Sequence, residues 1–244
     1  MSNPPGGGRT IKIIVLNFAQ FEWMSFDCYG TLIDWECGIL STLTPLLTKY
    51  AVELPEDLIL EFFGRKETEI QQGNYLDYRA VLRRIAQAFG AEWNFQPTQA
   101  ELLCLEKSLP HWPVFRDTVA SLQALKRRFK LAVLSNIDDD LFAQTAGGLG
   151  VAFDRVITAQ QIGSYKPCLN NFRALLEGVS CDPKRLLHVG QSRYHDIAPA
   201  RKLGLATVWV TRRRVGQACG ATPATEVQPD LVVPDLQTLA AHCQ

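Results

Sequence analysis

Short apolar runs alternate with helix-period segments throughout the second half of the chain. After Pro113, apolar or β-branched runs occupy Leu131–Leu134, Arg155–Thr158, Leu186–Val189, Ala206–Val210 and Leu231–Val233. The segments between them have helical spacing: Thr118–Phe129, Leu141–Leu149, Asn170–Gly178, Ile197–Leu203 and Leu236–His242. Such alternation predicts a parallel sheet with crossover helices on both of its faces. Strands that are apolar throughout fit a sheet that is buried on both sides.

The first half has a different pattern. One more buried strand is expected over Phe21–Asp27, and residues 35–112 then carry apolar side chains at helical spacing without a convincing strand. We therefore predict an α/β protein whose core comprises residues 20–34 and 113–244, with residues 35–112 inserted as a helical lid. Residues 1–19 form an N-terminal extension, with a Pro/Gly-rich tail before the apolar run Ile11–Phe18. That run is either an added strand or a start-site extension.

Composition and charge narrow the functional classes. The chain has 244 residues, 47% hydrophobic, with 25 basic and 25 acidic side chains. A net charge of zero offers no field to attract nucleic acid or an anionic membrane surface. Ile11–Phe18 is too short to span a bilayer and lacks a convincing signal-peptide cleavage site. The seven cysteines include no C-x-x-C pair, so we expect reduced thiols and a cytoplasmic location.

Ligands of such sheets bind outside the carboxyl ends of the strands. Asp27 ends the first strand, and Ser135 and Asn136 follow the next one. Lys166 lies in the loop after the Arg155–Thr158 strand, and residues 190–196 (GQSRYHD) follow Leu186–Val189. The lid leaves and rejoins the core at this same edge. We therefore expect these residues to form one site beneath the lid.

Each of these residues has a catalytic and an ordinary structural interpretation. Asp27 is either a covalent nucleophile or a turn aspartate, and Lys166 is either its charge partner or a solvated turn residue. Ser135 and Asn136 suit anion binding, although such turns are common. Asp196 either ligates a cation, orients a water or caps a helix, and the neighbouring His195 is expected to be structural. The arginines of residues 212–214 are expected in a solvated loop.

The ordered set Asp27, Ser135, Lys166 and Asp196, each at a strand end, resembles the haloacid dehalogenase superfamily over residues 20–240. The resemblance implies a Rossmann-like, doubly wound core with a helical cap and Asp27 as covalent nucleophile. The superfamily's phosphatases carry D-x-D and hold Mg²⁺ through acidic residues of their fourth motif. Here the second aspartate is Tyr29, and one fourth-motif carboxylate is the amide of Gln191. Both differences count against an ordinary phosphatase.

The motif D-x-Y-G-T-L is instead the form found in 2-haloacid dehalogenases, which need no metal. This resemblance implies that Asp27 attacks the halogen-bearing carbon and that water hydrolyses the resulting ester. It further implies roles in binding and catalysis for the residues Tyr29, Thr31, Ser135, Asn136, Lys166 and Asp196. Thr31 and Ser135 position the nucleophile and substrate, Lys166 balances charge, Asp196 orients the lysine and the hydrolytic water, and Asn136 lies near the departing halide. Arg65 is the nearest candidate for the arginine that dehalogenases place on the lid.

The chain departs from the dehalogenase pattern at Phe172, Gln191 and Arg193. Three functions therefore remain open. The first is metal-independent hydrolysis of a small 2-haloacid. The second is a Mg²⁺-dependent phosphatase using Asp27 and Asp196 as ligands, and the third is a catalytically silent binding protein. For the first we expect a small anionic substrate in a cationic pocket that includes Lys166, Arg193 and Arg65. An apolar face of the lid could pair two copies into a homodimer.

Overall fold

A computed structural model describes residues 16–212 and 225–244 of the chain. Most of the expected N-terminal extension, including most of the run Ile11–Phe18, lies outside these residues, as do Arg213 and Arg214. The first described element is a 3₁₀ turn at Phe18–Gln20. No helix in the described ranges is both long and apolar enough to cross a bilayer. Six cysteines fall within these ranges and are free thiols, with Cys28 and Cys243 buried.

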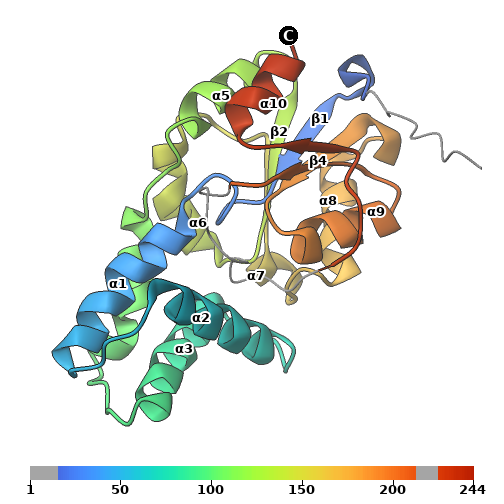
Figure 1. The fold of residues 1–244 in the computed structure, drawn as a ribbon. Helices are drawn as coiled ribbons and strands as arrows, with labels where there is room; N and C mark the ends of the chain where they lie inside the picture. The colour runs from blue at the N-terminus through green and yellow to red at the C-terminus, as the bar shows by residue number, and fades with distance from the viewer. Residues whose placement is uncertain (1–15, 213–224) are drawn as a thin grey trace, which may run out of the picture.

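The core is a parallel sheet of six strands over the described residues, in the order β3-β2-β1-β4-β5-β6 (Figure 1). The strands are β1 (Trp23–Phe26), β2 (Lys130–Ser135), β3 (Arg155–Thr158), β4 (Leu186–Gly190), β5 (Ala206–Val210) and β6 (Leu231–Val233). The order runs outward from β1 in both directions, which places the topological switch point beside β1. The predicted α/β fold with a parallel sheet is confirmed.

Helices cover both faces of the sheet. They are α5 (Thr118–Lys126), α6 (Asp139–Ala146), α7 (Ala159–Ile162), α8 (Leu169–Val179), α9 (Ala198–Lys202) and α10 (Leu236–His242). Alternate strand residues point to opposite layers, as the two-residue period of a strand requires. Met24 and Val133 join one apolar cluster, whereas Trp23 and Leu134 join the other. A π-helical turn over Arg193–Ile197 precedes α9, so this helical segment begins earlier than its apolar pattern indicates.

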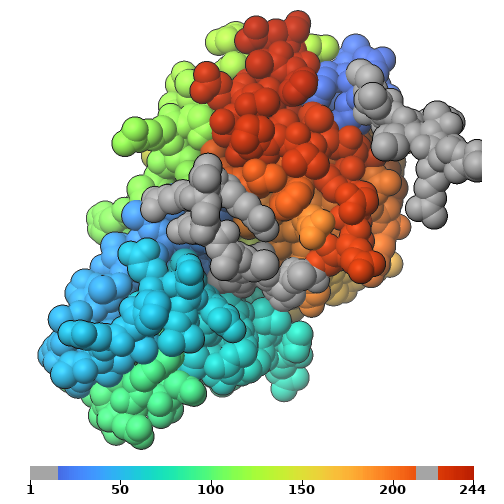
Figure 2. All heavy atoms as spheres, viewed as in Figure 1, coloured from blue at the N-terminus to red at the C-terminus, as the bar shows by residue number. Residues whose placement is uncertain are grey.

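The inserted segment forms a lid of helices beyond the carboxyl edge of the sheet. Its α-helices are α1 (Trp35–Lys49), α2 (Glu56–Gln71), α3 (Tyr78–Glu92) and α4 (Cys104–Ser108). In the space-filling view the lid, blue to green, projects from one end of the core as a separate lobe (Figure 2). Its buried side chains, such as Leu43, Phe63 and Phe89, belong to the larger apolar cluster of the core. The lid is therefore packed continuously with one layer of the core.

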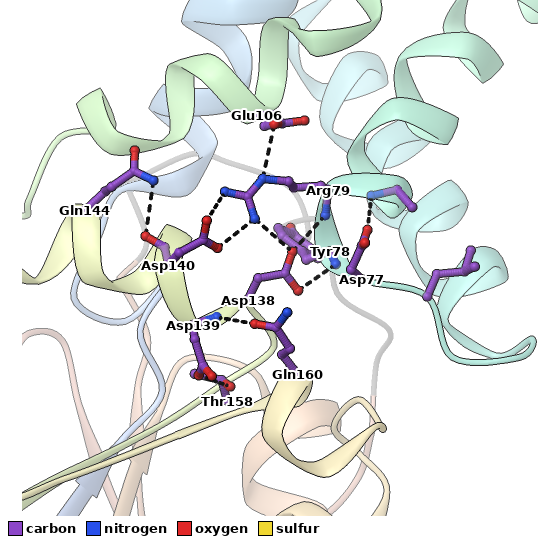
Figure 3. A network of polar contacts seen from close by, with 12 residues as sticks. Asp77, Tyr78, Arg79, Glu106, Asp138, Asp139, Asp140, Gln144, Thr158 and Gln160 are labelled. Atoms are coloured by element: carbon purple, nitrogen blue, oxygen red, sulfur yellow. Dashed lines mark hydrogen bonds and ion pairs between the residues drawn. The ribbon is translucent and has the colours of Figure 1, made fainter.

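A polar junction joins the lid to the core at the start of α3 (Figure 3). Arg79 donates to both carboxylate oxygens of Asp140, at 2.6 and 2.5 Å, and to Glu106 of α4 at 3.1 Å. The buried Asp138 accepts hydrogen bonds from the backbone N–H groups of Tyr78 and Arg79, at 2.9 and 3.1 Å. Since Asp138 follows β2, a core loop caps the N-terminus of a lid helix. The junction thereby fixes the position of Tyr78.

Candidate active site

The sheet register brings the chemistry-bearing residues to one edge. Phe26 of β1 pairs with Val133 of β2 and with Val189 of β4, so the carboxyl ends of these three strands lie within two residues of one another. The residues at and just after these ends, Asp27, Ser135–Asn136 and 190–191, therefore meet at one edge of the sheet. The sequence-based expectation that the predicted site residues converge is met by Asp27, Tyr29, Ser135, Asn136, Lys166 and Asp196, which all line one pocket.

The loop after β1 is closed by backbone hydrogen bonds, and its residue Thr31 holds the Asp27 carboxylate. The Thr31 hydroxyl donates to Asp27 Oδ2 at 2.7 Å and accepts the Gln191 backbone N–H at 2.9 Å. The Cys28 carbonyl accepts the N–H groups of residues 31–33, which closes the loop tightly. Gly30 sits in this loop at φ +95°, a conformation that side chains disfavour. Thr31 thus links the loop after β1, which carries Asp27, to the loop after β4.

Lys166 is a buried cation between two carboxylates. Its Nζ lies 2.8 Å from Asp27 Oδ1 and 2.6 Å from Asp196 Oδ1, with a side chain only 1% exposed. Asn136 clamps the backbone of the same residue, accepting the Lys166 N–H at 2.7 Å and donating to its carbonyl at 3.1 Å. The contacts of the Asn136 amide thus position the loop of Lys166, and its expected place near a departing halide stays a prediction.

The electrostatics of this triad follow from burial and pairing. Burial opposes ionisation of Lys166, but the two carboxylates outweigh it and raise its pKa to about 12. Burial also acts against ionised Asp196, yet Lys166 and His188 lower its pKa to about 2. For Asp27 burial dominates: its pKa is raised above the ordinary value although Lys166 opposes the rise. Asp196 is therefore the more readily ionised of the two carboxylates that bind Lys166.

Asp196 in turn contacts His188 of β4. His188 Nε2 lies 3.4 Å from Asp196 Oδ1, and His188 Nδ1 hydrogen bonds with Ser25 Oγ at 2.8 Å. Phe172, where the dehalogenase pattern has a tyrosine, packs its ring against His188 at 5.0 Å between centroids. Phe172 is fully buried and does not line the pocket. This departure from the pattern lies behind the site and leaves its lining unchanged.

Gly190 makes room for Asp196. A Cβ at position 190 would lie 2.6 Å from Asp196 Cβ and 2.7 Å from its Cγ, so Gly190→Ala must displace the aspartate. We expect a loss of about 1–3 kcal/mol of unfolding free energy, typical of overpacking, together with a large loss of activity. Urea unfolding and steady-state kinetics measure the two effects.

Gly147→Ala is the matched control. Gly147 has a helical φ of −58°, and no atom of the described residues lies within 4 Å of the point that a Cβ at this position would occupy. Its replacement is expected to leave stability unchanged or slightly improved. Equal effects of the two substitutions would contradict the assigned role of the close contact between Gly190 and Asp196.

The lid contributes a carboxyl group that the sequence-based prediction missed. Glu67 of α2 lines the pocket, is 8% exposed and accepts a hydrogen bond from the Tyr78 hydroxyl at 2.7 Å. Burial raises its pKa to about 7, with a smaller upward contribution from the charge on Asp27. A signal was present in the sequence: Ile59, Phe63 and Glu67 recur every four residues, so Glu67 continues the buried stripe of α2.

Arg65, the expected lid arginine, does not reach the pocket. Two helical positions separate it from Glu67, a rotation of about 200° about the helix axis. Its guanidinium lies over the Phe62 ring at 4.9 Å and 3.3 Å from Glu69, with the side chain 49% exposed. The structure therefore places Arg65 on the outer face of α2.

Arg193 and Arg212 also lie elsewhere than the sequence predicted. Arg193 stacks over Trp209 at 4.9 Å and does not line the pocket. Arg212, predicted to be solvated, has a side chain that is only 7% exposed: it pairs with Asp117 at 2.6 Å and donates to the Thr31 carbonyl at 2.7 Å. The solvated-loop prediction is thus wrong for Arg212, which instead hydrogen bonds to the loop after β1. Among the described lining residues the pocket has three acidic side chains and one lysine, so the expectation of a cationic pocket is wrong there.

The pocket is small and lies between the core edge and the lid. Its volume is about 50 Å³, which suits a small molecule. Trp35, Glu67 and Tyr78 of the lid line one side. The core supplies Asp27, Tyr29, Ser135, Asn136, Lys166, Gln191, Ser192, His195 and Asp196. Tyr29 is held by Thr145 at 2.8 Å, and burial raises its pKa well above the usual value, so it is a neutral hydrogen-bonding group.

An aspartate at a strand end, a lysine bridging it to a second aspartate, and a helical lid define a hydrolase site of one superfamily. The haloacid dehalogenase-like hydrolase family model matches residues 22–204, three quarters of the chain, and the protein belongs to this family.

Individual relatives differ in the activities that their names record. A phosphoserine phosphatase of Thermus thermophilus is 32% identical over 52% of this chain and 49% of its own length, so the chain spans about half of that relative. An (S)-2-haloacid dehalogenase of a Pseudomonas species is 26% identical over 77% of this chain and 83% of its own. The L-2-haloacid dehalogenase structure from Xanthobacter autotrophicus superposes with a TM-score of 0.76 at 21% identity, covering 91% and 97% of the two chains. That likeness establishes the fold.

Proposed function

We propose that this hydrolase removes halide from a small 2-haloacid through an ester on Asp27, without a metal ion. The observation that carries the proposal is the position of the Lys166 ammonium, bonded to both Asp27 and Asp196. The lysine keeps the nucleophile oriented and favours its ionised form against the cost of burial. The six free thiols among the described cysteines support the cytoplasm as its location.

The chemistry requires two steps. A carboxylate oxygen of Asp27 attacks the carbon that bears the halogen, the C–O bond forms, and the halide leaves with the C–X electron pair. Water then adds to the carbonyl carbon of the aspartyl ester. The 2-hydroxy acid departs, the Asp27 carboxylate is restored, and one proton passes to solvent. Asp27 lines the cavity, and Thr31 and Lys166 hold its two oxygens, so the nucleophile is pre-oriented.

The donor set does not fit Mg²⁺. Asp27 and Asp196, the two carboxylates that such an ion would need, already bind the Lys166 ammonium. At position 191 the loop offers an amide, and its backbone N–H and carbonyl are bonded to Thr31 and Trp209. Mg²⁺ demands near-octahedral coordination by hard, usually charged, oxygens. We therefore assign no step to a metal.

A substrate panel tests the proposal. Chloro-, bromo- and fluoro-2-haloacids and an aryl phosphate are each assayed with Mg²⁺ and with EDTA, and we expect halide release that EDTA leaves unchanged. In ¹⁸O-water, hydrolysis at the ester carbonyl must place label in the peptide containing Asp27. Phosphate release that requires Mg²⁺ would favour the phosphatase suggested by the Thermus relative. Absence of both activities and of label in a folded protein would favour a binding protein.

A further inference from the structure

The lid presents the pocket with a carboxyl group, Glu67, that pairs with no cation among the described residues. Among the described lining residues Lys166 is the sole ammonium or guanidinium group, and it is bonded to Asp27 and Asp196. Glu67 forms no ion pair within the described part of the chain, and its hydrogen-bond partner there is the phenol of Tyr78. A buried, unpaired carboxyl is favoured in its neutral, protonated form. Glu67 is thus an acid that can donate.

Tyr78 determines which oxygen of Glu67 carries the proton. The phenol donates to Oε1 at 2.7 Å, so Oε1 behaves as the carbonyl oxygen and the acid proton resides on Oε2. Tyr78 is held in turn, because Asp138 of the core accepts its backbone N–H at 2.9 Å. Oε2 has no hydrogen-bond partner among the described residues. The neutral acid therefore keeps one donor for an occupant of the pocket.

The direction of the reaction gives this donor a role. Asp27 lies at the sheet edge and Glu67 on the lid, and both line the same cavity of about 50 Å³. A nucleophile displaces a leaving group from the opposite side of carbon, so a group expelled by Asp27 moves away from the core. We propose that Glu67 is the lid residue that donates a hydrogen bond to the departing halide.

This inference rests on the proposed function and deepens it. As the Asp27 oxygen forms its bond to carbon, the halogen gains negative charge, and the hydrogen bond from Glu67 strengthens with it. Glu67 keeps its proton, and the halide leaves with the C–X electron pair. Fluoride, the strongest hydrogen-bond acceptor among the halides and the poorest leaving group, gains most from this contact. Glu67 would thus supply, from the lid, the contact to the halide for which the sequence resemblance suggested an arginine.

Several other ionisable groups lie around Glu67, and variants of Glu67 itself distinguish its protonation from theirs. Burial lowers the pKa of His195 to about 4. Burial opposes the ionisation of Asp196 and Lys166, but their mutual pairing lowers the pKa of Asp196 to about 2 and raises the pKa of Lys166 to about 12. Burial raises the pKa values of the facing phenols further above their usual range: Tyr29, Tyr78 and Tyr165. Burial raises the pKa of Asp27 above its ordinary value. His188 contacts Asp196. On α2 itself, Arg65, Lys66 and Glu69 pair on the outer face.

Halide binding without turnover is the first test. Line broadening of ³⁵Cl in sodium chloride reports bound chloride, and competition with fluoride reports fluoride. If chloride needs the protonated acid, affinity of the wild type falls about tenfold per pH unit above pH 7, where Glu67 ionises. Glu67→Gln keeps a donor that does not titrate, so its binding stays flat across this range. Glu69→Gln, exposed on the same helix, should behave as the wild type.

Two further variants keep the test independent of folding defects. Tyr78→Phe removes the hydrogen bond that lowers the pKa of Glu67, so the midpoint of chloride binding must move to higher pH. Glu67→Met removes the donor and should slow release of fluoride at least about tenfold more than release of bromide. A purely structural role for Glu67 predicts neither effect.

The outcomes separate the two proposals. If the wild type binds chloride with the expected pH dependence but releases halide from no 2-haloacid, the dehalogenase proposal fails and the anion site at Glu67 is supported. In the other case the wild type releases halide, and the Glu67→Gln variant has the same pH profiles of chloride binding and of kcat/KM as the wild type. Only the assignment of Glu67 then fails.

Discussion

Asp27→Asn is expected to lower kcat by about 10⁴-fold or more while making the protein more stable. The amide cannot form an ester by displacement, so the loss of rate falls on the chemical step. The gain in stability follows from the pKa of Asp27, which burial raises above its ordinary value. A carboxyl with a raised folded-state pKa stabilises the fold below its unfolded pKa and loses that contribution as pH rises through the folded value. At pH 7–8 the wild type therefore bears a cost that asparagine avoids.

This gain is expected as a rise in Tm relative to the wild type. Differential scanning calorimetry at pH 8 measures it, and the advantage of the variant should shrink as the pH is lowered. Asp57→Asn, at an exposed position in the first turn of α2, serves as control and should change neither Tm nor rate appreciably. A variant that keeps more than a few per cent of activity would remove Asp27 from the nucleophile role.

If Asp27→Asn is more stable and inactive, the proposed function has a stability cost at this site. The sequence located this site because strand ends in a parallel sheet share an edge. Asp27, Ser135, Lys166 and Asp196 are far apart in the chain, yet the alternation of apolar runs and helices already brings the loops that carry them together. Their convergence follows from topology and needs no knowledge of side-chain contacts.

The lid could not be predicted to the same depth. Its helices were evident from their spacing, but which face of α2 meets the pocket depends on how α2 packs against the core. Arg65 and Glu67 are two residues apart, and a rotation of about 200° separates an exposed cation from a buried acid. The resemblance to dehalogenases suggested that Arg65 lines the pocket. The apolar stripe through Ile59 and Phe63 indicates instead that Glu67 is on the buried face of α2.

Arg212 illustrates a second limit. A run of three arginines is typical of a solvated loop, and nothing local distinguishes the first of them. Its burial depends on Asp117 and on the carbonyl of Thr31, residues that lie 95 and 181 positions earlier in the chain. The partners of a buried charge are tertiary facts, so local patterns carry no signal for them.

Lys166→Met is expected to cost about 3–5 kcal/mol of unfolding free energy at neutral pH and to abolish turnover. The substitution leaves Asp27 and Asp196 buried without the ammonium that both contact. Lys166 is the charge that most strongly lowers the pKa of Asp196 to about 2 against the effect of burial. In the wild type the stability due to this lowered pKa is present above the unfolded value and is lost as pH falls through about 2.

Without the lysine, the carboxyls must take up protons, so the deficit of Lys166→Met should narrow as the pH falls from 8 to 5. Urea denaturation across this range measures the change. The double variant Lys166→Met with Asp196→Asn removes one of the two orphaned charges and should regain part of the stability without regaining activity. Lys202→Met, at an exposed helix end, should remain within about 0.5 kcal/mol of the wild type. A deficit that does not depend on pH would mean that Lys166 acts through packing, and the charge-bridging role assigned to it would fail.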